Sequence, residues 1–153
     1  MKKTVTIIAF LVLVCALSAC GPRNNNTDNT SEELAAQQAV PADDASGFVG
    51  TWAYGRCSMI ITPKDDVFIC KISWPTSATE TVDWSYNCSF EEGALVGDGQ
   101  GVKTVTTDGG KAETVYEDGE VKFEITLNGM VLWRDAKEDA GDGLIFEKKV
   151  VTE

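Results

Sequence analysis

The chain contains no histidine and few basic residues, and both shortages narrow its possible functions. With no His among 153 residues, it lacks the usual general base near neutral pH, and it cannot form His-ligated zinc sites or a Ser-His-Asp triad. Lys and Arg number 13 against 24 Asp and Glu, which gives a net charge of −11. Such a charge repels phosphate groups, so we expect no nucleic-acid binding and no electrostatic attachment to anionic lipid. A basic protein partner is permitted.

Carboxylates are the remaining candidates for catalysis or metal binding. The candidate acid–base pairs are Glu91 with Glu92, and Asp135 with Glu138 or Asp139. All of them lie in turn-like segments, where solvated acids are expected. Asp135, Asp139 and Asp142 could offer oxygen ligands to a hard cation, but their spacing lacks the Asp-x-Asp-x-Asp-Gly frame. We therefore predict a protein that is not an enzyme and that holds no metal or cofactor.

The chain also lacks a long apolar run. The run from Val5 to Leu17 is shorter than the roughly 20 residues that a membrane-spanning helix needs. Lys2 and Lys3 precede it and small residues follow, as in a secretory signal. The closing residues, Leu17-Ser18-Ala19-Cys20, closely resemble the lipobox of bacterial lipoproteins. The resemblance implies a signal peptide over residues 1–19, lipidation of Cys20, and anchoring to the cell membrane or outer membrane, facing away from the cytoplasm.

The segment after the anchor has little apolar area to bury. Gly21 to Thr30 contains no large apolar residue and cannot offset the entropy lost on ordering. Thr30 to Val40 could form a helical turn or two, with Thr30 and Glu33 as a capping box, but such short helices are marginal in water. We predict a disordered tether over residues 20–46 and one small folded domain over residues 47–153.

From Phe48 onward, short alternating runs are separated by Gly, Asp and Pro, and no stretch has a helical period. This texture predicts an all-β domain. The expected inward-facing sets are Phe48, Gly50, Trp52 and Tyr54; Met59 and Ile61; Phe68, Cys70, Ile72 and Trp74; and Val82, Trp84, Tyr86, Cys88 and Phe90. We expect the turn Pro63-Lys64-Asp65-Asp66 to join the second and third of these strands.

Glycine-rich segments divide the second half of the domain. We expect a flexible break at residues 97–101 and a turn at residues 108–110. Asp118-Gly119 predicts a hairpin, because a type I′ turn needs positive φ at both central positions. That hairpin would pair Tyr116 with Val121. It would direct Val121, Phe123, Ile125 and Leu127 inward.

The turn at Asn128-Gly129 leaves two registers open. A two-residue turn would pair Leu127 with Met130 and bury Leu132 and Arg134. A three-residue loop would pair Leu127 with Val131 and bury Trp133 instead. We prefer the second, because burying an indole gains free energy while burying an unpaired guanidinium costs more.

The strand pattern predicts how the domain closes. About eight to ten short strands with tight turns favour an antiparallel up-and-down meander that closes into a small barrel, since closure removes exposed edges. Gly50-Thr51-Trp52, at the start of the first strand, resembles the Gly-x-Trp opening of lipocalins and the broader calycin group. The run from Trp133 to Gly141, with Ile72-Ser73-Trp74 and Ser77 to Glu80, is similar to small bacterial surface lipoproteins of unassigned function.

Three cysteines remain in the mature domain, because Cys15 leaves with the leader and Cys20 is lipidated. They are Cys57, Cys70 and Cys88, an odd number for an oxidising compartment. We predict a Cys57–Cys70 disulfide across a short turn. A tight connection over residues 75–79 would pair Cys70 with Trp84 and leave Cys88 too far along its strand. The alternative is three buried free thiols.

These features favour two functions. The first is a lipid-anchored envelope protein whose acidic barrel binds a protein partner at its surface. The second is a lipocalin-like carrier of a small apolar or ring-shaped ligand. The carrier would line its barrel with Trp52, Trp74, Trp84, Tyr86, Phe123 and Trp133. If the same aromatic residues simply fill the core, the surface function is favoured.

Overall fold

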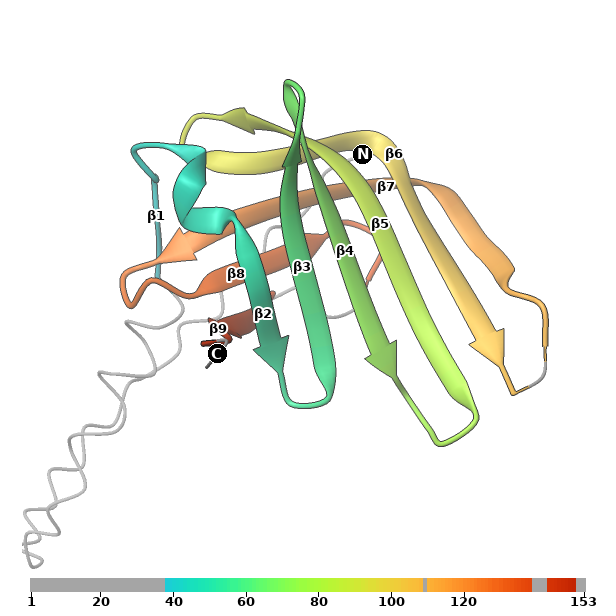
Figure 1. Cartoon of the computed structure of the whole chain (residues 1–153). Coiled ribbons are helices and arrows are strands. Elements are labelled where there is room, and N and C mark those ends of the chain that lie inside the picture. The colour runs from blue at the N-terminus through green and yellow to red at the C-terminus, as the bar shows by residue number, and fades with distance from the viewer. Residues whose placement is uncertain (1–37, 109, 139–142, 151–153) are drawn as a thin grey trace, which may run out of the picture.

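The computed structural model describes residues 38–108, 110–138 and 143–150, which form a closed antiparallel β-barrel. The strands are β1 (Ala39–Val40), β2 (Gly50–Tyr54), β3 (Cys57–Lys64), β4 (Val67–Pro75), β5 (Glu80–Glu91), β6 (Ala94–Thr107), β7 (Glu113–Thr126), β8 (Val131–Asp135) and β9 (Leu144–Lys148). From β2 to β9 each strand pairs with the next, and β9 pairs back with β2 (Figure 1). The predicted all-β meander and its closure are confirmed.

In strands β3, β4 and β5, buried and outward-facing side chains alternate as the sequence predicts. Ile61 pairs with Cys70, and Cys70 pairs with Tyr86, so one inward-facing row crosses three strands. All three side chains are buried. The turn between β3 and β4 is tighter than expected, because Lys64 already pairs with Val67 and only residues 65 and 66 lie between them.

A short 3-10 helix, η1 (Ala45–Phe48), plugs the end of the barrel where β2 begins. Phe48 was expected on the first strand, but it lies in this helix and is fully buried. The Trp52 indole Nε1 donates a hydrogen bond to the Phe48 carbonyl at 2.8 Å. The Phe48 ring packs edge-on against Phe90 at 6.3 Å. We call this end, with Phe48, Trp52 and Phe90, the plugged end.

Part of the predicted tether belongs to the folded domain. In β1, Ala39 pairs with Thr126 and Val40 with Ile125. The backbone N–H of Ala42 donates to the Gly93 carbonyl at 2.9 Å. Residues 38–46, which we assigned to the tether, therefore lie against the barrel. The predicted signal peptide and Cys20 lie outside the described residues. Within the described part of the chain, no helix is long and apolar enough to cross a membrane.

Two glycine-based predictions for β6 and β7 are wrong. Both strands run on through the expected break at residues 97–101 and the expected hairpin at Asp118-Gly119. Their register shifts on both sides of the pair Gly101 and Gly119. A Cβ at Gly101 would come within 2.5 Å of the Tyr86 ring. Gly101 therefore permits close packing between β6 and the Tyr86 ring inside a bulged strand pair. The chain reverses between the end of β6 at Thr107 and the start of β7 at Glu113, near the turn that was predicted at residues 108–110.

The β7–β8 register buries Trp133, as preferred, but through a different pairing. Val131 pairs with Ile125 rather than with Leu127, and Leu127 is 53% exposed in the turn. The two registers differ by an even number of residues, so the same side chains of β8 face inward. Leu132, on the opposite side of β8, is also buried.

Candidate functional site

The structure brings five of the six predicted ligand-binding residues together inside the barrel. The buried residues are Trp52, Trp84, Tyr86, Phe123 and Trp133. The Trp84 and Trp133 rings meet edge to face with centroids 5.3 Å apart, and Tyr86 meets Phe123 in the same way at 6.0 Å. Such edge-to-face contacts are typical of a packed aromatic core. The residues were therefore predicted correctly as an inward-facing set, and they pack against one another.

The sixth residue, Trp74, is partly exposed at the opposite end from the plug. We call this end, where β2, β4, β6 and β8 finish, the mouth. The Trp74 ring contacts Tyr54 at 6.3 Å, and Tyr54 also contacts Phe146 at 6.1 Å. Tyr54 is 44% exposed, so the predicted inward face of the first strand holds for Trp52 only.

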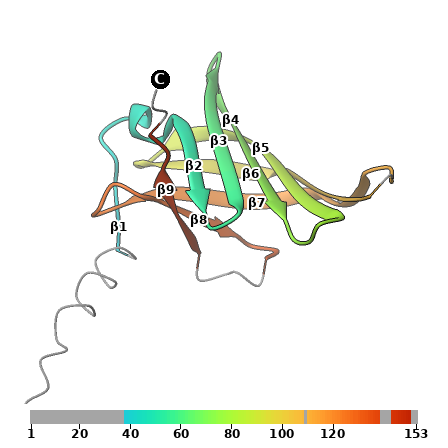
Figure 2. The same ribbon diagram turned by 60° about the horizontal axis from the view of Figure 1, so that its bottom comes forward.

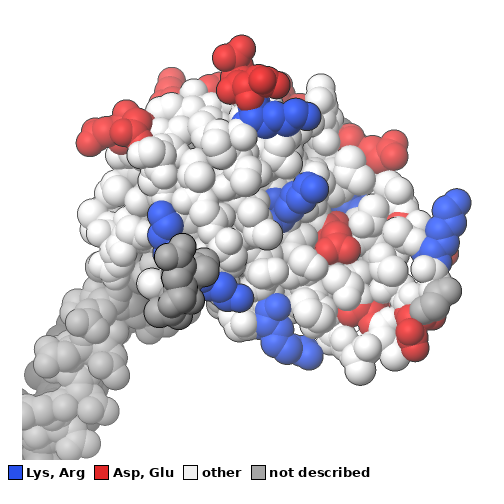
Figure 3. All heavy atoms as spheres, in the orientation of Figure 1, with Lys and Arg blue, Asp and Glu red and all other residues white. Residues whose placement is uncertain are grey.

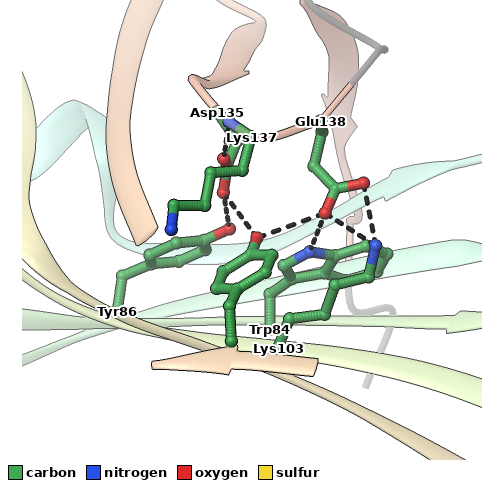
Figure 4. A network of polar contacts seen from close by, with 7 residues as sticks. Trp84, Tyr86, Lys103, Asp135, Lys137 and Glu138 are labelled. Carbon is green, nitrogen blue, oxygen red and sulfur yellow. Dashed lines mark hydrogen bonds and ion pairs between the residues drawn. The ribbon is translucent and has the colours of Figure 1, made fainter. Parts of the chain in front are cut away.

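A polar network lies at the mouth, where the end of β8 and the residues that follow it contact strands β5 to β7 (Figure 4). We call it the mouth network. Its centre is Asp135, which is only 5% exposed. Tyr86 Oη donates to Asp135 Oδ2 at 2.5 Å, and Tyr116 Oη donates to the same oxygen at 3.0 Å. The backbone N–H of Lys137 donates to Oδ1 at 2.7 Å.

Glu138 forms the second half of the mouth network. Lys103 Nζ contacts its two oxygens at 2.7 and 3.0 Å, and the Trp84 indole Nε1 donates to Oε1 at 3.1 Å. Tyr116 Oη lies 3.2 Å from the same oxygen, so this hydroxyl links the two carboxylates. The Lys103 ammonium also lies over the Trp84 ring, 5.1 Å from its centroid. Ion pairing and cation–π contact together fix this lysine in place.

The surroundings of the two tyrosines keep them protonated. Burial is the main cause that raises the pKa of Tyr86, and the hydrogen bond and negative charge of Asp135 raise it further. Burial likewise raises the pKa of Tyr116. Both hydroxyls therefore stay donors near neutral pH. Asp135 and Glu138 were expected to be solvated, but their oxygens accept hydrogen bonds from side chains of β5, β6 and β7. The network therefore connects these strands to the end of β8 and the residues that follow it.

The remaining candidate carboxylates lie partly outside the described residues. Asp139 and Asp142 lie outside the described residues, and among those described no cluster of three His, Cys, Asp or Glu side chains could hold a metal. Glu91 and Glu92 are exposed at the turn between β5 and β6. This is the solvated position that the sequence predicts for them.

The predicted Cys57–Cys70 disulfide is not formed, because Cys57, Cys70 and Cys88 are all free and buried. Ile61 is the β3 residue that pairs with Cys70, and Cys57 lies four positions before Ile61 in β3. Four strand residues span about 13 Å, whereas bridged Cα atoms lie within about 7 Å. Cys88 pairs with Phe68, two positions from Cys70 rather than the expected four. Burial raises the pKa of Cys57 to about 12, so this thiol is a poor nucleophile.

Exposed carboxylates lie along the first half of β7 and on the neighbouring part of β6. We call this region the acidic edge, and its exposed members are Asp98 on β6 and Glu113, Glu117, Asp118 and Glu120 on β7. Lys137 pairs with Asp118. Strand β8 reaches β7 only from Val121 onward, with one further backbone bond to the Glu120 carbonyl. Figure 2 shows β6 and β7 running on past the end of β8, so within the described residues one backbone edge of 113–119 has no strand beside it.

No protein-family model, curated protein or solved structure matches the chain. The function is therefore inferred from the geometry of the barrel. Lys103 and Tyr116 were not predicted as members of the mouth network, because the expected hairpin at Asp118-Gly119 paired Tyr116 with Val121. The unpaired part of β7 was missed for the same reason.

Proposed function

We propose that this protein is a lipid-anchored component of the bacterial cell envelope, is not an enzyme, and binds a basic partner protein through the acidic edge. The observation that carries the proposal is a run of strand backbone, residues 113–119, which is flanked by carboxylates and has one edge with no strand beside it among the described residues. The interior of the barrel is filled by aromatic side chains, and the mouth network closes one end of it. Both features support a function on the outer surface. The lipobox sequence supports the anchor.

The partner's contact segment would add to the barrel as an extended strand. Its backbone would hydrogen-bond to the free edge of β7, and its Lys or Arg side chains would face Glu113, Glu117 and Glu120. A second copy of this chain would bring the same carboxylates to the contact. Like charges opposite each other destabilise a strand pair, so the acidic edge favours a basic partner over self-association.

A capture experiment with matched variants tests the partner function. Full-length protein in detergent micelles serves as bait for envelope extract. One variant carries Glu113→Gln, Glu117→Gln and Glu120→Gln. The control carries Asp65→Asn, Asp66→Asn and Glu147→Gln, which remove the same charge elsewhere. We expect a basic protein captured by wild type and control but lost with the edge variant. Equal capture by all three would contradict the acidic edge as the binding surface.

The anchor is tested independently of the partner. Mass spectrometry of wild-type protein extracted with detergent should find acyl mass on the N-terminal peptide that begins at Cys20. Cys20→Ala should leave an unprocessed or wrongly cleaved precursor. Two acyl chains are needed for stable anchoring. A mature N-terminal peptide without acyl mass on Cys20 would exclude the lipoprotein assignment.

One observation favours the carrier as a second candidate. The Trp133 indole Nε1 is buried and has no hydrogen-bond partner among the described residues. A buried unpaired donor costs free energy, and the carbonyl or carboxylate of an interior ligand would satisfy it. Titration with fatty acids and haem-like rings, followed by tryptophan fluorescence, tests this function. A change that saturates at one equivalent would support a carrier, whereas no response across the panel would leave the surface function favoured.

A further inference from the structure

A separate hollow of about 340 Å³ lies on the outer face of β3 to β6. Two cross-strand rows of outward-facing side chains line it. The first row is Ser58, Ser73, Asp83 and Thr104, in which each residue pairs directly with the next. The second row is Ile60, Lys71, Ser85 and Val102, paired in the same way. The regular register therefore brings hydroxyls, one carboxylate and one ammonium to a single place. We call it the outer groove.

The polar side chains of the outer groove are free to bind a ligand. Within the described part of the chain, none of its hydroxyls makes a side-chain hydrogen bond, and neither Asp83 nor Lys71 makes an ion pair. Asp83 is nevertheless partly buried between its neighbours. A half-buried carboxylate without a donor is costly compared with one that is hydrogen-bonded. A ligand with hydroxyl donors would satisfy it.

The two apolar members complete the chemistry of the outer groove. Ile60 and Val102 occupy the two ends of the second row, and Ile60 is 47% exposed, which is unusual for so large an aliphatic side chain. They offer apolar surface beside the hydroxyl row. A ligand that fits has apolar C–H faces together with several hydroxyl groups, and its size must suit a hollow at the lower end of the small-molecule range. A saccharide meets all three conditions.

The charge of this face also favours an uncharged ligand. The protein carries a net charge of −11, yet the surface over β2 to β5 in Figure 3 is mostly uncharged, and its acidic side chains lie mainly towards the margins. In the outer groove the single carboxylate of Asp83 is matched by the single ammonium of Lys71. The groove therefore neither selects a cation, as the acidic edge does, nor attracts an anion strongly.

We propose that the outer groove is a binding site for a neutral saccharide. The Asp83 carboxylate accepts hydrogen bonds from sugar hydroxyls, Lys71 and the serine and threonine hydroxyls donate to sugar oxygens, and the C–H face of a ring rests on Ile60 and Val102. This site is separate from the acidic edge and does not depend on the partner function.

Calorimetric titration of the full-length protein tests the proposal. The protein is held in a detergent without a sugar head group, and the probes are oligomers of glucose and oligomers of N-acetylglucosamine. We expect one of the two series to bind with one site per chain. Asp83→Asn should weaken that binding at least about tenfold, because it removes charge-assisted hydrogen bonds. Ser73→Leu, which fills the hollow, should abolish it.

Asp66→Asn is the matched control, since it removes one carboxylate from the exposed β3–β4 turn outside the groove. It should bind as wild type does. Circular dichroism of each variant checks that the barrel is intact. The proposal is overturned if neither series binds at millimolar concentration. It is also overturned if Asp83→Asn and Ser73→Leu, both folded, bind as tightly as the control.

Discussion

The two ends of the barrel are closed by different chemistry. At the plugged end, η1 and the rings of Phe48, Trp52 and Phe90 make a mainly apolar closure, in which the Trp52 indole donates a hydrogen bond to the Phe48 carbonyl. At the mouth, Asp135 and Glu138 are held by hydroxyl, indole and ammonium groups. An apolar plug gains free energy from all the area it buries. A buried polar network first has to offset the cost of removing its charges from water.

This difference indicates which end can respond to its surroundings. The rings that form the plug do not titrate, and the charged groups beside them, Asp44 as the N-cap of η1 and Lys148 over the Trp52 ring, lie at its margin. Each hydrogen bond of the mouth network, in contrast, depends on a protonation state. Stability should therefore reside mainly at the plugged end, and sensitivity to pH at the mouth. Mutations that leave one end intact can test both statements.

The largest expected effect is at the plugged end. Trp52→Ala should lower the free energy of unfolding by about 3–5 kcal/mol, because it leaves a large cavity in a fully buried site. Trp52→Phe should cost less, since it keeps most of the ring and loses the hydrogen bond to the Phe48 carbonyl. Chemical denaturation followed by circular dichroism measures both. A loss below 1 kcal/mol for Trp52→Ala would show that the plug is not the main closure.

The mouth network should contribute less. Asp135→Ala leaves the hydroxyls of Tyr86 and Tyr116 without their shared acceptor, at an expected cost of about 2–3 kcal/mol. Asp135→Asn retains an acceptor oxygen and should cost about 1 kcal/mol. The same denaturation experiment compares the two variants. If Asp135→Ala proved as costly as Trp52→Ala, the two ends would be equivalent in stability.

Sequence reasoning worked where one strand supplied the whole pattern. In β5 the alternation of Trp84, Tyr86 and Cys88 with polar residues is local, and the structure confirms its inward face. Trp133 was also placed correctly, because the choice between burying an indole and burying a guanidinium decided the side of β8 that faces inward. These predictions needed only the period of a strand and the cost of burial.

Sequence reasoning failed where two strands fix each other's register. Asp118-Gly119 has the composition of a tight turn, but Gly119 lies opposite Gly101 inside a long bulged pair. The sequence of β7 alone does not show that Gly119 pairs with a glycine of β6. It also does not show that the Tyr86 ring occupies the space where a side chain at position 101 would lie. The mouth network depends on this register, so Lys103 and Tyr116 could not be assigned before it was known.

The N-terminal strand offers a smaller test of the plugged end, because β1 and Ala42 lie beside its loops. A chain that begins at Asp43 lacks the pairing of β1 with β7 and the backbone bond from Ala42 to Gly93. A chain that begins at Gln38 keeps both. The shorter chain also loses the bond from the Leu127 N–H to the Gln38 carbonyl. We expect it to be less stable by about 2 kcal/mol, because it loses several backbone hydrogen bonds worth about 0.5–1.5 kcal/mol each. If the two chains had equal thermal midpoints, residues 38–42 would add nothing to the stability of the domain, and the predicted tether over residues 20–46 would stand.

The smallest expected effect is the pH response of the mouth. Burial, followed by the hydrogen bond and charge of Asp135, raises the pKa of Tyr86 above its usual range, whereas an unfolded tyrosine titrates near about pH 10. The folded state therefore holds this proton more tightly. Its contribution to stability is fully present below about pH 10 and is lost progressively as the pH rises from there through the folded pKa. Linkage gives a loss of about 1 kcal/mol between pH 10 and 11.

Denaturation at pH 8, 10 and 11 measures this loss, and Tyr86→Phe isolates it. The buried thiols also destabilise the fold in alkali, since burial raises the pKa of Cys57 to about 12, but they are present in wild type and variant alike. Tyr86→Phe should therefore lose less stability than wild type between pH 10 and 11. Trp52→Phe, at the plugged end, should follow the wild-type slope because an indole does not titrate there. If both variants kept the wild-type slope, the alkaline sensitivity would not originate at Tyr86, and the contrast between a pH-sensitive mouth and an insensitive plug would be wrong.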